Sequence, residues 1–175
     1  TGSELGNITA GILAIGDGAA GDMIVNGIST ANSANITKVD LRSSSITFST
    51  GGSTFNDLAA TANTGAITGA VGLTVAGTST FTTSANNQSI TLSSTSNDFT
   101  SAVSFNTTGS SANTTLVTNS AIILGASTIG GDHSVTVGGT SKTMAISGAQ
   151  DVGGTITLQS SGDLTLTSSL ASSSS

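Results

Sequence analysis

The chain of 175 residues has no cysteine, proline, tryptophan or tyrosine, and only 7% of its residues are charged. Without cysteine it forms neither a disulfide framework nor a thiolate metal site. Three Lys and Arg residues stand against nine Asp and Glu residues. Because phosphate backbones and anionic membranes attract clustered cations, this balance argues against both as partners. The longest apolar runs, such as 121–124, are far shorter than the roughly 20 residues that cross a bilayer. We therefore expect no nucleic-acid partner and no membrane insertion.

The residues that are present can build a thin core. Hydrophobic residues make up 35% of the chain and the mean hydropathy is +0.26, values too high for a disordered linker. Serine and threonine supply about a third of the residues and glycine supplies 23. The composition therefore favours a folded chain with a polar, largely uncharged exterior.

A short strand pattern recurs along the chain. An apolar residue, a threonine and a second apolar residue follow one another between runs of Gly, Ser, Asn and Asp. This alternation buries two side chains on one face of a strand and leaves the hydroxyl outside. A chain that repeats one short strand buries it against neighbouring repeats. The triplets are at 46–48, 73–75, 90–92 and 164–166, with related forms at 8–10, 135–137 and 156–158.

The spacing of these strands predicts an all-β parallel solenoid. When the strands are counted in pairs, the step along the chain is about 20 residues, so the chain makes eight to nine coils. We also expect almost no helix. Glycine pairs such as Gly51-Gly52 and Gly153-Gly154 supply the turns. We expect residues 1–175 to form a single β-solenoid segment, either part of a longer repetitive chain or a stacking unit.

The pattern also predicts which side chains point inward. The apolar residues of the strands should face the core, and the hydroxyl residues between them should face out. Inward positions are Ile90, Leu92, Val103, Phe105, Val135, Val137, Ile156, Leu158, Leu164 and Leu166; outward positions are Thr91, Ser104, Thr136, Thr157 and Thr165. Neither Thr1-Gly2-Ser3 nor the closing serines can cover the ends, so we expect further coils there or end-to-end contact with another copy.

Three segments carry a resemblance to a known family. Residues 96–105 (SNDFTSAVSF) resemble an Asn-Asp-Phe-x-x-x-Val repeat, residues 124–137 resemble the element that follows it, and 13–27 share its style. The family is that of filamentous-haemagglutinin-like exoproteins exported by two-partner secretion. The resemblance implies a right-handed parallel β-helix that serves as the shaft of an adhesin. It also implies a secreted, extracellular or cell-surface location, with host or matrix glycans as partners.

Candidate reactive residues are few. His133 is the only histidine, and a general base needs an orienting partner and a pocket, so we expect a partly buried strand residue at a coil edge. Asp17, Asp22, Asp132 and Asp163 adjoin glycines but lack the nine-residue period of calcium-binding rolls, so we expect turn formers. Clustered carboxylates beside aromatic rings, which glycoside chemistry uses, are missing. We predict no catalytic, cofactor-binding or metal-binding residue, no cofactor and no enzymatic activity.

The function that follows is a structural shaft of a secreted bacterial surface adhesin or extracellular fibre, supporting attachment or matrix formation. The alternative is a threonine-rich β-helical module that binds ice or glycans. Thr-x-Thr occurs at 78–80, 80–82, 155–157 and 165–167, but the irregular intervals argue against one in-register face. Uniform threonine columns would favour ice, and a groove lined by Asn, Asp and a Phe would favour a sugar. The five Asn-x-Ser/Thr sequons match the number expected by chance; they are Asn7, Asn35, Asn87, Asn106 and Asn113.

Overall fold

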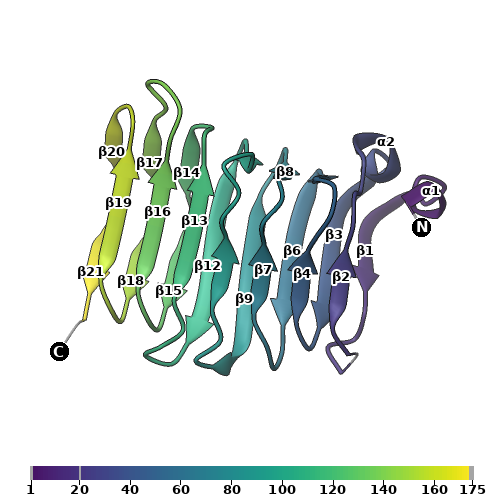
Figure 1. Cartoon of the computed structure of the whole chain (residues 1–175), viewed down its shortest axis with the longest axis horizontal. Coiled ribbons are helices and arrows are strands. Elements are labelled where there is room, and N and C mark those ends of the chain that lie inside the picture. The colour runs from purple at the N-terminus through teal and green to yellow at the C-terminus, as the bar shows by residue number, and fades with distance from the viewer. Residues whose placement is uncertain (1, 20, 174–175) are drawn as a thin grey trace.

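A computed structural model describes residues 2–19 and 21–173 as a rod of stacked coils (Figure 1). The strands form three sheets, here called A, B and C, and every strand pairing is parallel. This confirms the parallel β-solenoid predicted from the sequence.

Sheet A has eleven strands. They are β1 (Ala10–Ile15), β3 (Ile36–Ser43), β6 (Asp57–Ala62), β9 (Ser79–Asn86), β12 (Ala102–Thr108), β14 (Ile122–Leu124), β15 (Ser127–Ile129), β17 (Met144–Ile146), β18 (Gln150–Val152), β20 (Leu164–Leu166) and β21 (Leu170–Ser172). Coils are numbered from their sheet A strand, so β1 belongs to coil 1 and β12 to coil 5. From coil 6 onward each sheet A layer consists of two short strands, since β14 and β15 both pair with β12.

Sheet B has seven strands, one for each complete coil. They are β2 (Met23–Val25), β4 (Ile46–Phe48), β7 (Ile67–Gly69), β10 (Ile90–Leu92), β13 (Thr114–Thr118), β16 (His133–Val137) and β19 (Ile156–Ser160). The equivalent first residues of these strands are 19 to 24 residues apart in the chain. The rod therefore has seven complete coils, and β20 and β21 add an eighth layer to sheet A. The expected eight to nine coils was slightly too many, because most coils are longer than 20 residues.

Sheet C covers the third face only in the middle of the rod. Its strands are β5 (Ser53–Phe55), β8 (Leu73–Val75) and β11 (Asp98–Phe99). The one-turn helix α2 (Thr30–Ser33) packs against β5 and occupies this face in coil 1, and α1 (Gly2–Leu5) contacts α2. Beyond β11, turns replace strands on this face. The two short helices are the only departures from the predicted all-β chain among the described residues.

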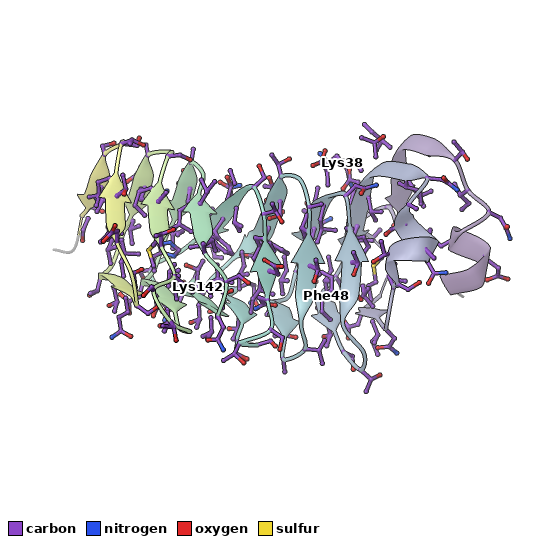
Figure 2. The ribbon with its side chains drawn as sticks, turned by 90° about the horizontal axis from the view of Figure 1, so that it is seen from above. Lys38, Phe48 and Lys142 are labelled. Carbon is purple, nitrogen blue, oxygen red and sulfur yellow. The ribbon has the colours of Figure 1, made fainter. Side chains whose placement is uncertain are left out.

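The core is a continuous stack of inward side chains with phenylalanines at its centre. All five phenylalanines are at most 2% exposed. Phe81 lies in the middle of the cluster, stacked on Phe105 with ring centroids 5.8 Å apart and edge-on to Phe48 and Phe99. Figure 2 shows Phe48 within the outline of the ribbon, whereas Lys38 lies at its outer edge. These aromatic contacts connect coils 2, 4 and 5.

The predicted strand parity is confirmed in the middle of the rod. Ile90, Leu92, Val103, Phe105, Val135 and Val137 are buried, and the hydroxyl residues between them are half-buried. In the last coils the packing differs. Ile156 and Leu158 are half-buried, whereas Leu164 and Leu166 are 44% and 51% exposed. These two leucines are in register with buried Met144 and Ile146, so the predicted inward direction is confirmed. The prediction that they are buried is wrong, because no further layer of the described chain covers them.

The corner between sheets A and B is made of stacked glycines. Gly109 has a φ of +93°, and Asn87, with a φ of +61°, lies one coil below it. A Cβ on Gly130 would overlap the carbonyl oxygen of Gly109, and a Cβ on Gly153 would overlap that of Gly130. Successive coils therefore meet backbone to backbone at this corner, and a side chain there would force the coils apart.

The alternation predicts that a charged side chain destabilises the fold when it replaces an inward residue of a strand and has little effect when it replaces an outward residue. Val135 is fully buried on β16 and the next residue, Thr136, is half-buried and faces out. Val135→Asp should lower the free energy of unfolding by about 3 kcal/mol or more, because an unpaired carboxylate would enter the apolar stack. Thr136→Asp should change it by less than about 1 kcal/mol. Chemical denaturation of both variants checks this, and equal losses would show that the register is wrong.

Candidate binding surface

The most regular feature of the exterior is a column of hydroxyl side chains on sheet B. Strand pairing places one such residue directly above another in six successive coils. The members of this hydroxyl column are Thr47, Thr68, Thr91, Thr115, Ser134 and Thr157. With layers about 4.8 Å apart, the column extends about 24 Å along the rod. Below it, in coil 1, the equivalent position is Ile24, which is 65% exposed.

Local sequence explains why these hydroxyls face outward. Each residue except Thr68, which is followed by Gly69, lies between two inward side chains of its own strand, as Thr91 does between fully buried Ile90 and Leu92. Four of the six are half-buried, while Thr68 and Thr157 are exposed. The hydroxyls of Thr47 and Thr68 lie 3.2 Å apart, within hydrogen-bonding distance. The column thus forms a row of donors and acceptors with a methyl group beside all but one of them.

Sheet A has no equivalent row. Its outward column combines charged, amide and hydroxyl side chains, in the order Arg42, Thr61, Thr82, Asn106, Thr128 and Asp151. Asp40 and Arg42 form an ion pair of 2.7 Å on the same face. By contrast, no strand of sheet B contains Asp, Glu, Lys or Arg. The uniform column is therefore specific to one face of the rod.

The expectation that the Thr-x-Thr segments do not form one in-register face is confirmed, but a different set of hydroxyl residues is in register on sheet B. Coils of different length absorb their extra residues in the turns, so the strands stay aligned. The Thr-x-Thr segments named from sequence do not share a face, since Thr80 and Thr82 lie on β9 and Thr165 lies on β20, both in sheet A. Thr47, Thr91 and Thr157 were predicted to face outward as central residues of the repeated triplets, whereas Thr68, Thr115 and Ser134 were missed.

A groove of about 470 Å³ lies where sheet C ends. It is lined by Asp98 and Phe99 of β11, by Ile122 and Ile123 of β14, and by the turns beside them. This combination includes the Asp and Phe expected of a sugar site. Phe99, however, is only 2% exposed and its ring packs edge-on against Phe81, so it presents no aromatic platform for a sugar.

Asn97, within the motif that carries the family resemblance, joins three coils. Its side chain is 1% exposed; Oδ1 accepts a bond of 3.0 Å from the Leu73 amide, and Nδ2 donates to the carbonyls of Leu92 and Val117. Asn97 is thus a buried bridge between coils, placed where the backbone ladder of sheet C stops.

His133 is buried inside the rod, deeper than the coil-edge position expected. It is 1% exposed, its Nδ1 lies 2.5 Å from the hydroxyl of Thr114, and its ring centroid lies 5.7 Å from that of Phe105. Nε2 has no partner among the described residues. Burial lowers the pKa of His133 to about 4, so the imidazole is neutral at physiological pH. Among the residues that the structure describes, no carboxylate bonds to it as the orienting partner of a general base would.

Three of the four aspartates singled out from sequence, Asp17, Asp22 and Asp132, bind nearby chain groups. Asp132 Oδ1 accepts a bond of 2.7 Å from the Thr155 amide one coil above, and Asp17 Oδ1 accepts one of 2.9 Å from the Ala19 amide. Asp22 Oδ1 accepts a bond of 2.7 Å from the Ser45 hydroxyl. Within residues 2–19 and 21–173 no three His, Cys, Asp or Glu side chains converge as a metal site would require. The same residues contain no helix long and apolar enough to cross a membrane.

Comparison with known families matches most of the chain. A family described as repeats of unknown function (DUF5649) matches residues 36–106 and 111–172. The chain belongs to this repeat family. The first match begins at Ile36, the first residue of β3, and the second runs from the turn before β13 into β21. No curated protein and no solved structure matches the chain significantly. The family describes a repeat architecture, so the resemblance to filamentous-haemagglutinin-like adhesins stays a prediction.

The buried imidazole makes stability depend on pH. Its pKa is about 4 in the folded chain and about 6.5 when exposed. Its contribution is therefore fully present above pH 6.5 and is lost as the pH falls from 6.5 to 4. Between pH 7 and pH 5 we expect a loss of about 2 kcal/mol in unfolding free energy. Denaturation of His133→Leu over the same range should lack this loss, and an identical slope in both proteins would contradict the assignment.

Proposed function

We propose that this chain is the structural shaft of a secreted bacterial surface adhesin or extracellular fibre, supporting attachment or matrix formation. The observation that carries the proposal is the unbroken parallel ladder. Sheet B runs through seven layers and sheet A through eight, and neither is interrupted along the described rod. A stack in which each coil is bonded to the next resists bending and extension because many main-chain bonds strain together.

Buried side-chain bonds between coils support this mechanical role. Asn97 joins coils 3, 4 and 5, and the Gln150 amide donates to the carbonyls of Gly125 and Gly148. Asn56 donates to the Ile36 carbonyl at 2.8 Å. These bonds lie at corners and strand ends, where a solenoid is most easily opened. They stabilise the rod between its sheets.

The distribution of reactive groups supports a role without catalysis. The one imidazole is inside the core. The carboxylates of Asp17 and Asp132 accept bonds from backbone amides, Asp22 binds a hydroxyl, and Asp40 pairs with Arg42. A secreted or cell-surface location rests on the resemblance of residues 96–105 and 124–137 to exoprotein repeats. The hydroxyl-rich exterior favours host or matrix glycans as partners through many weak hydrogen bonds.

A rigid shaft predicts a narrow distance between points far apart along it. The chain has no cysteine, so Thr61→Cys/Asp151→Cys can be spin-labelled at these two positions alone. These residues lie four layers apart in one outward column, about 19 Å. Pulsed electron paramagnetic resonance should give one narrow distance, and Thr61→Cys/Ala171→Cys should give a distance about 5 Å longer. A broad distribution under native conditions would contradict a shaft.

We also propose that the rod continues end to end, through further coils or contact between copies. In the last layers the inward residues Leu164, Leu166 and Leu170 are 37% to 51% exposed, and in the first layer Ile15, which is in register with buried Leu41, is 38% exposed. In the first coils, a cavity of about 320 Å³ lies among Leu5, Met23 and their neighbours. Exposed strand edges beside apolar side chains recruit further strands. A chain with few charged residues offers little electrostatic repulsion against this association.

Sedimentation over a wide concentration range tests this continuation. The parent chain should associate, and Leu166→Lys should shift the equilibrium toward monomer at least tenfold by placing a charge in the apolar end layer. Thr165→Lys, on the same strand but facing out, is the matched control and should associate like the parent. A parent that stays monomeric at high concentration would refute end-to-end contact between copies.

The alternative function, a binding module, is favoured by one observation. The hydroxyl column of sheet B is uniform through six coils, and a uniform column is the feature that distinguishes an ice-binding module from a shaft. The groove beside β11 does not support a sugar module in the same way, because its phenylalanine is buried. The column is therefore the basis of the inference that follows, which does not depend on the shaft proposal.

A further inference from the structure

We propose that the hydroxyl column of sheet B is an ice-binding surface, in which each coil anchors one step of a row of ordered water. The column consists of Thr47, Thr68, Thr91, Thr115, Ser134 and Thr157, in register through six coils. Its occupant would be the lattice of water on an ice crystal.

The first argument is regularity. Consecutive residues of the column are separated at the backbone by one strand spacing, about 4.8 Å, and the hydroxyls of Thr47 and Thr68 turn toward each other to 3.2 Å. Each hydroxyl offers one donor and two acceptors. The pairings of sheet B contain no register shift, whereas the β9–β12 pairing of sheet A shifts between Asn106 and Thr108. Sheet B therefore repeats one chemical unit at a constant interval, as contact with a lattice requires.

The second argument is chemical composition. The strands of sheet B contain no charged residue, and their only ionisable side chain, His133, is buried. Ions hold water in shells that do not fit ice, whereas small hydroxyl and methyl groups leave water free to bond to other water. Sheet A, with Arg42 and Asp151 in its outward column, lacks this property. The two faces of the rod thus differ in charge, the property on which the proposal depends.

The same face is poorly suited to a sugar. Glycan sites use aromatic rings or convergent polar groups. Every phenylalanine of this chain is buried, and it has no tyrosine or tryptophan. The hydroxyl column gives one hydroxyl per layer in coils 2 to 7, and the strands that carry it have no charged side chain to converge on a sugar. Ordered water fits this geometry better than a carbohydrate chain.

One row predicts a particular kind of activity. The neighbouring outward positions in the longer strands are mixed, with Val117, Thr136 and Gln159 in successive coils. Binding therefore depends on a line of contacts along the rod, not on a broad two-dimensional array. The protein should slow the recrystallisation of polycrystalline ice and partition into slowly grown ice, with little depression of the freezing point.

A matched pair of substitutions tests the face. Thr91→Tyr breaks the column at its third layer, and Thr82→Tyr makes the same change in the same coil on sheet A; both positions face out and are half-buried. Recrystallisation of a frozen sucrose solution is followed with the full chain and both variants. The parent and Thr82→Tyr should inhibit at the same concentration, and Thr91→Tyr should need at least tenfold more.

Folding is checked by circular dichroism and chemical denaturation. If Thr91→Tyr does not fold, Thr91→Val replaces it, keeping the β-branched shape and the methyl group while removing the hydroxyl. It should weaken inhibition several-fold. A parent that neither inhibits recrystallisation nor enters ice overturns the proposal, as does equal loss in the Thr82 and Thr91 variants. Retention of the parent on cellulose or chitin with no effect on ice, abolished by Thr91→Tyr, would assign the face to glycans instead.

Discussion

Main-chain hydrogen bonding between successive coils is the constraint on which the rest of this structure depends. It sets the distance between layers and aligns each residue with an equivalent one in the next coil. Inward alignment stacks Ile46, Ile67 and Ile90, and outward alignment stacks Thr47, Thr68 and Thr91. The core and the hydroxyl column are therefore two sides of one ladder, and a shift of one residue would exchange them.

Where the ladder weakens, polar side chains take over its role. Sheet C stops after β11, and Asn97 bonds there to Leu73, Leu92 and Val117 in three different coils. His133 and Thr114 form a buried polar pair inside sheet B, in layers where other coils have isoleucine. Such pairs add specificity between layers at a cost, since Nε2 of His133 has no partner among the described residues. This buried pair links the stability of the rod to acidity.

The sequence was sufficient for the strand type, the parallel stack and the direction of most side chains. These depend on local alternation, which is visible in triplets such as Ile90-Thr91-Leu92. It was insufficient for the helix α2, the loss of sheet C and the division of a sheet A layer into β14 and β15. Those features depend on which residues of different coils meet, and turn length decides that. For this reason the sequence did not predict the hydroxyl column as a column. It did not predict the exposure of Leu164 and Leu166 because burial requires a neighbouring layer.

The stacked glycine corner has a consequence for how such chains vary. Since Gly130 lies against Gly109 and Gly153 lies against Gly130, a larger residue in one coil is tolerated only if the adjoining coil yields space. Substitutions at this corner should therefore appear in related chains as correlated pairs about one coil apart. The repeats of such a chain would then diverge as linked neighbours, and a duplicated or transplanted coil would fit only beside a coil with a compatible corner.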